Sequence, residues 1–308
     1  MSDEFKNRGP KPGGRPDRKR GGRPAGGNRG PKGRGRHAGK GKKHDKTPEI
    51  VLTPTRWVGR GEALVDTEFR PLHVWGGIPG EPGRVHVYHR GQNLDRGRWI
   101  GSDDPSSTRR KPPCDKFDRC GGCPLMHIEP TAQHDARLAM VARLFEEHKV
   151  DVALPLTVID SPDGTENYRH VIKMVAGRSD WNRTRLGAYE RDSHKVLPIP
   201  NCRVATSSLR RAMGTITHHV VARDIEPWDE QTERGVLRHV VVRQSGLTNE
   251  LMVTLVVGRR PKILHDLAMD IAQGIAEVAG VHLHVNGEPG NAIFHVRDGV
   301  IHTRPLEG

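Results

Sequence analysis

Beyond about residue 48, hydrophobic and polar positions alternate in short runs divided by Gly and Pro. The run "EIVLTPTRWVGRGEALVDTE" predicts two strands around a turn at residues 59–61, and "LHVWGGIPGEPGRVHVYHR" predicts two more strands around its central breaker. Strands of this length, separated in this way, are typical of a small OB-like β-barrel, which we expect over residues 48–111. Small barrels of this kind often bind oligonucleotides, but a fold alone does not give a function.

Helical spacing of apolar positions follows in three places. Residues 131–148 predict a helix with Thr131 as its N-cap, and Ser207 is expected to cap a second one. A third helix is expected over residues 262–280, ending at Gly280.

Strand patterns lie between and after these helices. "NYRHVIKMVAG" and "RTRLGAYERDSHKVLPI" predict strands, and "GVLRHVVVRQS" with "NELMVTLVVGR" predicts a hairpin around "GLTN". "VHLHVN" and "AIFHV" predict short strands, the latter followed by a turn at "RDG". Because helices and strands do not strictly alternate, residues 112–308 are expected to form an α+β domain.

Charge is concentrated at the N-terminus. Residues 1–46 carry 16 Lys and Arg against 4 Asp and Glu, a net charge of +12, while the whole chain of 308 residues carries +13. This Gly-, Arg-, Pro- and Lys-rich tail has almost no apolar side chains to bury, so we expect it to be disordered and to contact a phosphate backbone. The sequence contains no signal peptide and no membrane-spanning run, which predicts a cytoplasmic protein without a membrane partner.

Three of the four cysteines lie in "PPCDKFDRCGGCPLMH". They are Cys114, Cys120 and Cys123, and the fourth, Cys202, lies at the predicted end of a strand. In a reducing compartment such a cluster favours metal ligation or catalysis over disulfides. Four thiolates suit a [4Fe–4S] cluster or a tetrahedral zinc site, and His127 could replace one sulfur in the zinc case. Uncoordinated thiols and a catalytic cysteine remain open at this point.

These residues carry a family resemblance. "PPCDKFDRCGGCPLMH" followed by "PIPNC" resembles the iron–sulfur signature of the S-adenosylmethionine-dependent RNA (uracil-5-)-methyltransferases, and "GRGEALV" with "VWGGIPGE" resembles their TRAM domain. "LGAY", "GVLRHVVVR" and "GNAIF" extend the resemblance from about residue 48 to the end. It implies a TRAM barrel, a central domain in which Cys114, Cys120, Cys123 and Cys202 bind a [4Fe–4S] cluster, and an RNA substrate.

The chain also departs from that family's pattern. The family continues into a Rossmann-like methyltransferase domain with a Gly-rich cofactor loop, an "NPPR"-like stretch, a nucleophilic cysteine and a general-base glutamate, none of which is seen here. We therefore expect a truncated chain or a fragment, inactive by itself, with no catalytic or cofactor-binding residue of its own. S-adenosylmethionine is expected only if a catalytic domain is supplied, for example by a separate chain.

Candidate RNA contacts are cations and one aromatic residue on or near the predicted barrel. Arginine beside an aromatic ring suits phosphate contact and base stacking, although ordinary surface arginines and a core tryptophan are an equally valid interpretation. The set comprises Arg56, Trp57, Arg60, Arg84, Arg109, Arg110 and Lys111.

The leading hypothesis is thus the RNA-binding, iron–sulfur portion of an RNA (uracil-5-)-methyltransferase. Its long basic tail favours rRNA over tRNA as the structured RNA bound. The alternative is a stand-alone iron–sulfur or zinc RNA-binding protein without transfer chemistry.

Overall fold

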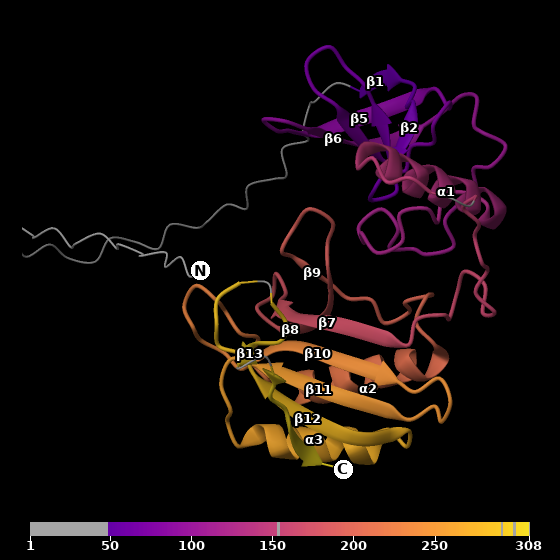
Figure 1. Ribbon diagram of the computed structural model, residues 1–308. Coiled ribbons are helices and arrows are strands. Elements are labelled where there is room, and N and C mark those ends of the chain that lie inside the picture. The colour runs from indigo at the N-terminus through magenta and orange to yellow at the C-terminus, as the bar shows by residue number, and fades with distance from the viewer. Residues whose placement is uncertain (1–48, 153–154, 291, 298–299, 308) are drawn as a thin grey trace, which may run out of the picture. The chain divides into compact units, whose positions relative to one another are not determined.

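The computed structural model describes residues 49–152, 155–290, 292–297 and 300–307. The predicted basic tail at residues 1–46 and the predicted turn at residues 298–299 lie outside the described residues. Within these residues the chain forms two large mixed sheets, three helices and one small hairpin (Figure 1).

Six strands form the first sheet, in the order β1-β5-β6-β4-β3-β2. They are β1 (Glu49–Leu52), β2 (Arg56–Val58), β3 (Glu62–Val65), β4 (Leu72–Trp75), β5 (Gly83–Arg90) and β6 (Asp95–Gly101). Strands β4 and β5 lie where alternation predicts them, and the first predicted run divides into β1, β2 and β3, whereas no strand was predicted at β6. The inward positions of the sheet, including Val74 and Val85, build one buried cluster.

The OB-like barrel predicted for residues 48–111 is not confirmed, because the described residues show no closed barrel. Closure requires the edge strands β1 and β2 to pair, and among the described residues β1 pairs with β5 and β2 with β3. A parallel pair between β4 and β6 places these two strands in the middle of the sheet. Such a pair joins strands that are distant in the sequence, so alternation alone does not reveal it. Among the described residues the first sheet is therefore open.

Seven strands form the second sheet, in the order β15-β12-β11-β10-β7-β8-β9. They are β7 (Val171–Arg178), β8 (Thr184–Tyr189), β9 (Val196–Leu197), β10 (Leu237–Gln244), β11 (Leu251–Val257), β12 (Val278–Val285) and β15 (Arg304–Glu307). The predicted hairpin is confirmed, because β10 and β11 pair antiparallel around residues 245–250. The predicted strand "AIFHV" is reduced to β13 (Val296–Arg297), which pairs with β14 (Val300–Ile301).

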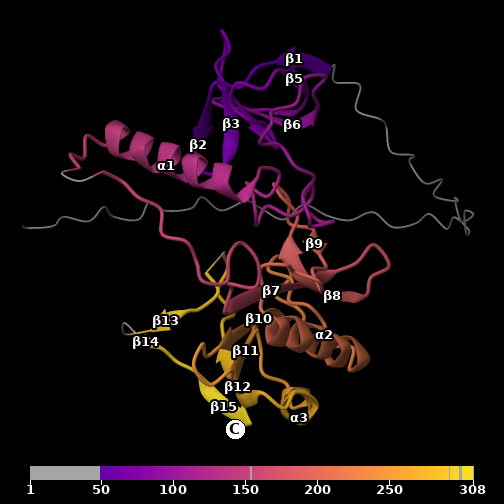
Figure 2. The same ribbon diagram turned by 90° about the vertical axis from the view of Figure 1, so that its right-hand side faces the viewer.

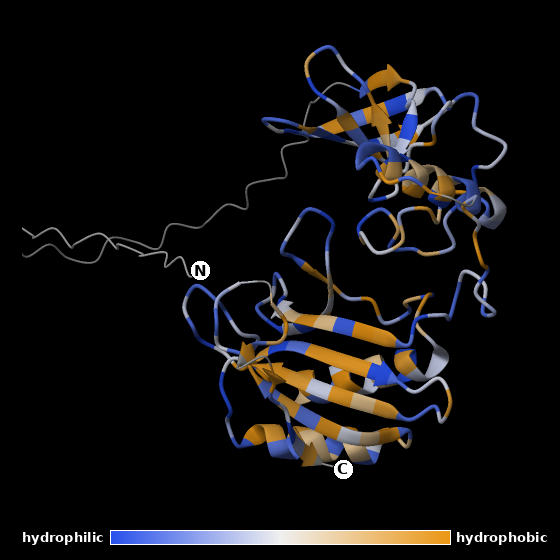
Figure 3. Ribbon diagram, viewed as in Figure 1, coloured by the Kyte–Doolittle hydropathy of each residue, from blue (hydrophilic) through white to orange (hydrophobic). Residues whose placement is uncertain are grey.

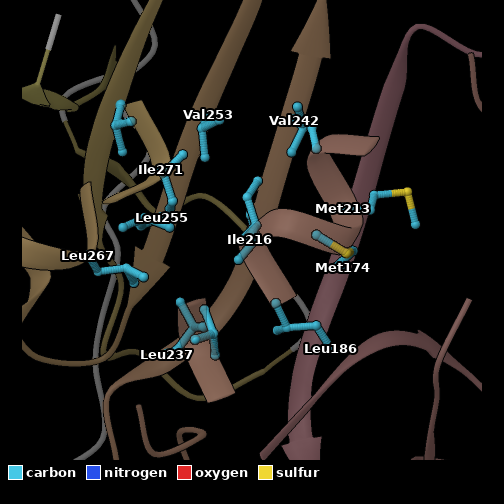
Figure 4. Close-up of a cluster of buried hydrophobic side chains, with 14 of the residues drawn as sticks. Met174, Leu186, Met213, Ile216, Leu237, Val242, Val253, Leu255, Leu267 and Ile271 are labelled. Atoms are coloured by element: carbon cyan, nitrogen blue, oxygen red, sulfur yellow. The ribbon is translucent and has the colours of Figure 1, made fainter. Parts of the chain in front are cut away.

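Helices α2 (Ser207–Ala222) and α3 (Ile263–Gly274) cover one face of the second sheet (Figure 2). Their apolar sides meet the sheet in a single core, in which Ile216 and Leu267 lie against strand residues such as Val242 and Leu255 (Figure 4). The α+β mixture expected for this part of the chain is confirmed, and α3 provides the crossover between the parallel strands β11 and β12.

The ends of the helices differ from the sequence predictions. Helix α1 (Pro130–Glu147) begins at a proline, which suits a first turn because its missing N–H needs no partner there, so Thr131 is not the cap. Helix α2 is capped by Thr206, not Ser207, with the Thr206 hydroxyl accepting from the Leu209 N–H. Helix α3 ends at Gly274, and Gly280 lies within β12 instead.

Helix α1 packs against residues of the first sheet and its following loops. Ala136 is buried in a cluster with Ile78, Leu125 and Ile128. The expected boundary at residue 112 stays a prediction, but this packing ties residues 125–140 to the part of the chain before it. In the part of the chain that the structure describes, none of the helices combines the length and apolar character needed to cross a membrane.

Candidate functional site at the four cysteines

All four cysteines line one cavity of about 80 Å³. None of them forms a disulfide, and each is half-buried. The other walls come from the loop before α1 and from the segment between β9 and α2, including Phe117, Met126 and Val204. Two segments far apart in the sequence therefore bring their thiols to the same place.

Tight turns fix the loop that carries three of the thiols. The Phe117 N–H donates to the Cys114 carbonyl at 3.2 Å, and the Cys120 N–H donates to the Lys116 carbonyl at 2.7 Å. Cys120 also forms an antiparallel bridge with Glu190. A Cβ placed on Gly122 would lie 3.4 Å from the Cys120 sulfur, so this glycine lets the chain pass close to a thiol.

Cys202 is held between a strand and a helix. Strand β9 ends five residues before it, and the Thr206 cap of α2 follows it. Its carbonyl accepts from the Ala205 N–H at 3.2 Å and from the Arg210 guanidinium at 3.5 Å. The Cys202 side chain packs, together with Cys114 and Cys123, against an apolar cluster formed by Trp75, Phe117, Met126 and Val204.

The environment of the thiols disfavours an uncompensated thiolate. The pKa of Cys123 is raised to about 11, first by burial and then by the neighbouring Cys202. Burial also raises the pKa of Cys120, with Cys202 and Cys114 adding to the effect. A nucleophilic cysteine needs a lowered pKa, so neither residue has the character of an activated nucleophile. A positively charged group bound between the thiols would reverse this balance.

His127 does not join the cysteines. Its side chain is buried, its Nε2–H donates to the Gly77 carbonyl at 3.1 Å, and its ring packs near Phe117 and Trp57. Burial lowers the pKa of His127 to about 4. It does not line the cysteine cavity, so the geometry gives no support to a zinc site of three cysteines and His127. Among the described residues, no group of three or more His, Cys, Asp or Glu side chains is arranged to hold a metal ion.

The expected RNA contacts are distributed around the first sheet and the loop after it. Arg60, Arg84 and Lys111 are exposed. Arg56 is exposed but paired with Asp66, its Nη2 lying 3.0 Å from a carboxylate oxygen. Trp57 is half-buried and packs against the cluster that includes Ile128, so its ring is not a free stacking surface. RNA contact by these residues stays a prediction.

Arg109 and Arg110 are bound within the protein. The Arg109 Nε donates to both carboxylate oxygens of Glu81, at 2.7 and 2.9 Å, and its guanidinium lies 4.9 Å from the centroid of the Trp99 ring. The Arg110 Nε donates to the Met126 carbonyl at 3.4 Å. These contacts hold in place the segment that leads into the cysteine loop.

Two arginines close to the cysteines were missed by sequence reasoning. The positive charge of Arg169 lowers the pKa of Cys123, against the larger effect of burial. The Arg191 guanidinium lies 4.1 Å from the centroid of the Trp75 ring, and the Arg191 N–H donates to the Arg119 carbonyl at 2.8 Å. No sequence signal relates either residue to the cysteines, so only the folded chain brings them together.

Comparisons with known proteins find similarity to RNA methyltransferases. No protein-family model matches the chain. An uncharacterised RNA methyltransferase of Geobacter sulfurreducens is 27% identical over 264 residues, covering 85% of this chain and 52% of the relative. An uncharacterised RNA methyltransferase of Gloeobacter violaceus is 26% identical over 250 residues, covering 81% of this chain and 54% of the relative. The chain is similar to RNA methyltransferases. It spans about half the length of the curated relatives it matches.

A solved structure shares the fold. The Pyrococcus abyssi tRNA (uracil-54, C5)-methyltransferase, in complex with S-adenosyl-L-homocysteine, aligns with a TM-score of 0.53 at 19% identity, covering 78% of this chain and 52% of its own. At this identity the likeness concerns the fold.

Proposed function

We propose that this chain is the RNA-binding, [4Fe–4S]-carrying portion of an S-adenosylmethionine-dependent RNA (uracil-5-)-methyltransferase. The observation that carries the proposal is the convergence of Cys114, Cys120, Cys123 and Cys202 on one cavity. The similarity to RNA methyltransferases over most of the chain supports the reaction class.

The kind and number of donors, four thiols, are those that a [4Fe–4S] cluster requires. Four free thiols from two rigid segments meet beside apolar walls, and a [4Fe–4S] cluster takes one thiolate on each iron. Its ligands bind four separate irons, so they need not converge on a single point as they would around one zinc ion. When bound, the cluster supplies the positive iron centres that keep buried thiolates ionised.

The proposed role of the cysteines is structural. The cysteines tie the loop before α1 to the segment between β9 and α2, and Arg191 holds that loop through the Arg119 carbonyl. We assign no step of methyl transfer to any described residue. The cofactor loop, the nucleophile and the general base of the reaction are proposed to come from polypeptide beyond the sequence given, either in the same protein or in a separate chain.

The proposed partner is structured RNA, rRNA rather than tRNA, held by cations of the first sheet and by the basic residues at positions 1–46. The chemistry of that contact is charge neutralisation of phosphates, which makes affinity fall as salt rises. The proposed compartment is the cytoplasm, where cysteines stay reduced and available as ligands.

The cluster is tested by anaerobic purification of the full chain. The proposal expects a brown protein with broad absorbance near about 400 nm, the range typical of thiolate-bound iron. Cys202→Ser should lose most of the iron, whereas Ser207→Ala, an exposed position nearby that does not line the cavity, should keep it. A colourless protein with stoichiometric zinc, or a Cys202→Ser variant with full iron content, would contradict the cluster assignment.

Calorimetry with S-adenosylmethionine tests whether the cofactor site lies outside this chain. The proposal expects no binding to this chain alone. Binding with a stoichiometry near one would show that the chain contains the cofactor site, and the assignment of transfer chemistry to other polypeptide would be wrong.

A further inference from the structure

The second sheet has one face without helices. Strand residues such as Ile172, Met174 and Val240 point to α2 and α3, so their neighbours in sequence point to the opposite side. Figure 3 shows hydrophilic bands crossing the otherwise hydrophobic strands. On the opposite side β7, β8, β10, β11 and β12 place Lys173, Arg185, His239, Arg243, Thr254 and His282. We call this the helix-free face.

Strand pairing brings these residues into register. Val241 lies opposite Lys173 on one neighbouring strand and opposite Thr254 on the other, and Thr254 lies beside His282. Arg243 lies two residues further along β10, diagonal to Lys173. Side chains in diagonal positions on neighbouring strands are about 7–8 Å apart, within reach of one extended ligand.

The cations on this face form no ion pair with the described residues. Lys173 and Arg243 are exposed and Arg185 is half-buried, and no ion pair to any of the three occurs among residues 49–307 as far as they are described. Within the five strands, the positions on this face include no Asp or Glu. By contrast, arginines elsewhere pair with carboxylates, as Arg223 does with Asp270 across the two helices.

Part of this side is covered. The β13–β14 hairpin stands on the side of the sheet away from α2 and α3 (Figure 2). At the β12 end the buried His284 donates from Nδ1 to the His302 carbonyl at 2.8 Å and accepts from the His295 N–H at 2.9 Å. The uncovered cations lie on β7 and β10, in the middle of the sheet.

Unpaired like charges on neighbouring strands destabilise a sheet, so their presence without carboxylates points to a ligand that supplies the negative charge. On this face β7 and β11 carry no aromatic side chain, and β10 carries only the half-buried His239. The strands that hold Lys173 and Arg243 therefore offer little of the base-stacking platform that sheet surfaces use to read RNA sequence. Lysine and arginine alone suit phosphates.

We infer that the helix-free face is a second RNA-binding surface, on which Lys173 and Arg243 contact phosphates of a single-stranded or looped segment without reading its sequence. This inference rests on the proposed binding of RNA. It adds a surface on the second sheet to the expected contacts, all of which precede residue 112.

The test is the salt dependence of RNA binding by the full chain carrying Lys173→Ala and Arg243→Ala. Each lost phosphate contact on a single strand lowers the slope of log affinity against log salt by about 0.7, so the double variant should lose about 1.4. Over a fourfold rise in salt, wild-type affinity should therefore fall about sevenfold more than that of the variant. The decrease in slope caused by the two substitutions should be similar for RNAs of unrelated sequence.

The matched control is Arg260→Ala with Lys262→Ala, which removes the same charge from exposed positions before α3. Its slope should equal that of the wild type, and melting temperature with iron content verifies the fold of both variants. Equal slopes for wild type and the Lys173 and Arg243 variant would overturn the inference while leaving RNA binding intact. A wild type that binds no RNA would overturn the proposed function as well. Unchanged RNA binding combined with lost binding of polyglutamate would identify a surface for an acidic protein, and would overturn the inference too.

Discussion

Glu81 and Arg109 form a buried ion pair at the entrance to the cysteine loop. The Glu81 side chain is fully buried, and both its oxygens accept from the Arg109 Nε. Arg109 also donates to the Gly76 carbonyl at 2.9 Å, so the pair links the turn after β4 to the chain that leads to Cys114.

This pair should be visible in stability measurements. Arg109→Met leaves the Glu81 carboxylate buried without a partner, which should cost about 3 kcal/mol or more of the free energy of unfolding. Replacing both residues by Met should recover much of that loss, because two apolar side chains need no partner there. Urea unfolding of the wild type, of the two single variants Arg109→Met and Glu81→Met, and of the double variant gives the interaction free energy between the two residues. Additive losses would show that the two residues do not depend on each other.

His127 should make stability depend on pH. Its pKa is lowered from 6.5 to about 4 in the folded protein, first by burial and then by the charge of Arg109, so the unfolded chain binds the proton more readily between these values. The stability that the neutral His127 contributes is complete above about pH 6.5 and is lost as the pH falls toward 4. At pH 5 the loss amounts to about 2 kcal/mol of the free energy of unfolding.

The matched variant is His127→Gln, which keeps an N–H donor for the Gly77 carbonyl and does not titrate. Urea unfolding at pH 7 and at pH 5 should show the wild type losing about 2 kcal/mol more than the variant. Parallel losses in the two proteins would mean that His127 titrates normally and is not buried as described.

The cap of α2 gives a third prediction. Thr206→Ala removes the acceptor for the Leu209 N–H and should cost about 1 kcal/mol, whereas Thr206→Ser should keep most of that stability. Ser207→Ala serves as the control, because Ser207 is the first helical residue and not the cap. A larger loss from Ser207→Ala than from Thr206→Ala, measured by the urea midpoint, would restore the cap expected from the sequence.

Local patterns predicted much of the fold. Alternation located most strands of both sheets, although it gave no strand at β6 or at β15. The hairpin around residues 245–250 followed from two apolar runs and a polar turn. Helix ends were less accurate, since Thr206 and Ser207 are both good caps and only the backbone chooses between them. The open first sheet depends on the β4–β6 pair, which joins distant segments and leaves no local signal.

The site was predictable in part. The spacing of three cysteines and the resemblance to a family suggested that Cys202 joins them, and one cavity receives all four. The positions of Arg169 and Arg191 beside the cysteines could not be predicted, because no local sequence pattern indicates a contact between these segments. The helix-free face depends on which side of the sheet α2 and α3 cover, and alternation gives two faces without saying which one the helices take.

The central claim is that Cys114, Cys120, Cys123 and Cys202 together hold one iron–sulfur cluster. Its most direct test is iron and acid-labile sulfide per chain, with native mass spectrometry, on the full protein purified or reconstituted without oxygen. The account predicts about four iron and about four sulfide per chain, and loss of both in Cys202→Ser. One zinc per chain without sulfide, or a cluster content unaffected by Cys202→Ser, would contradict it.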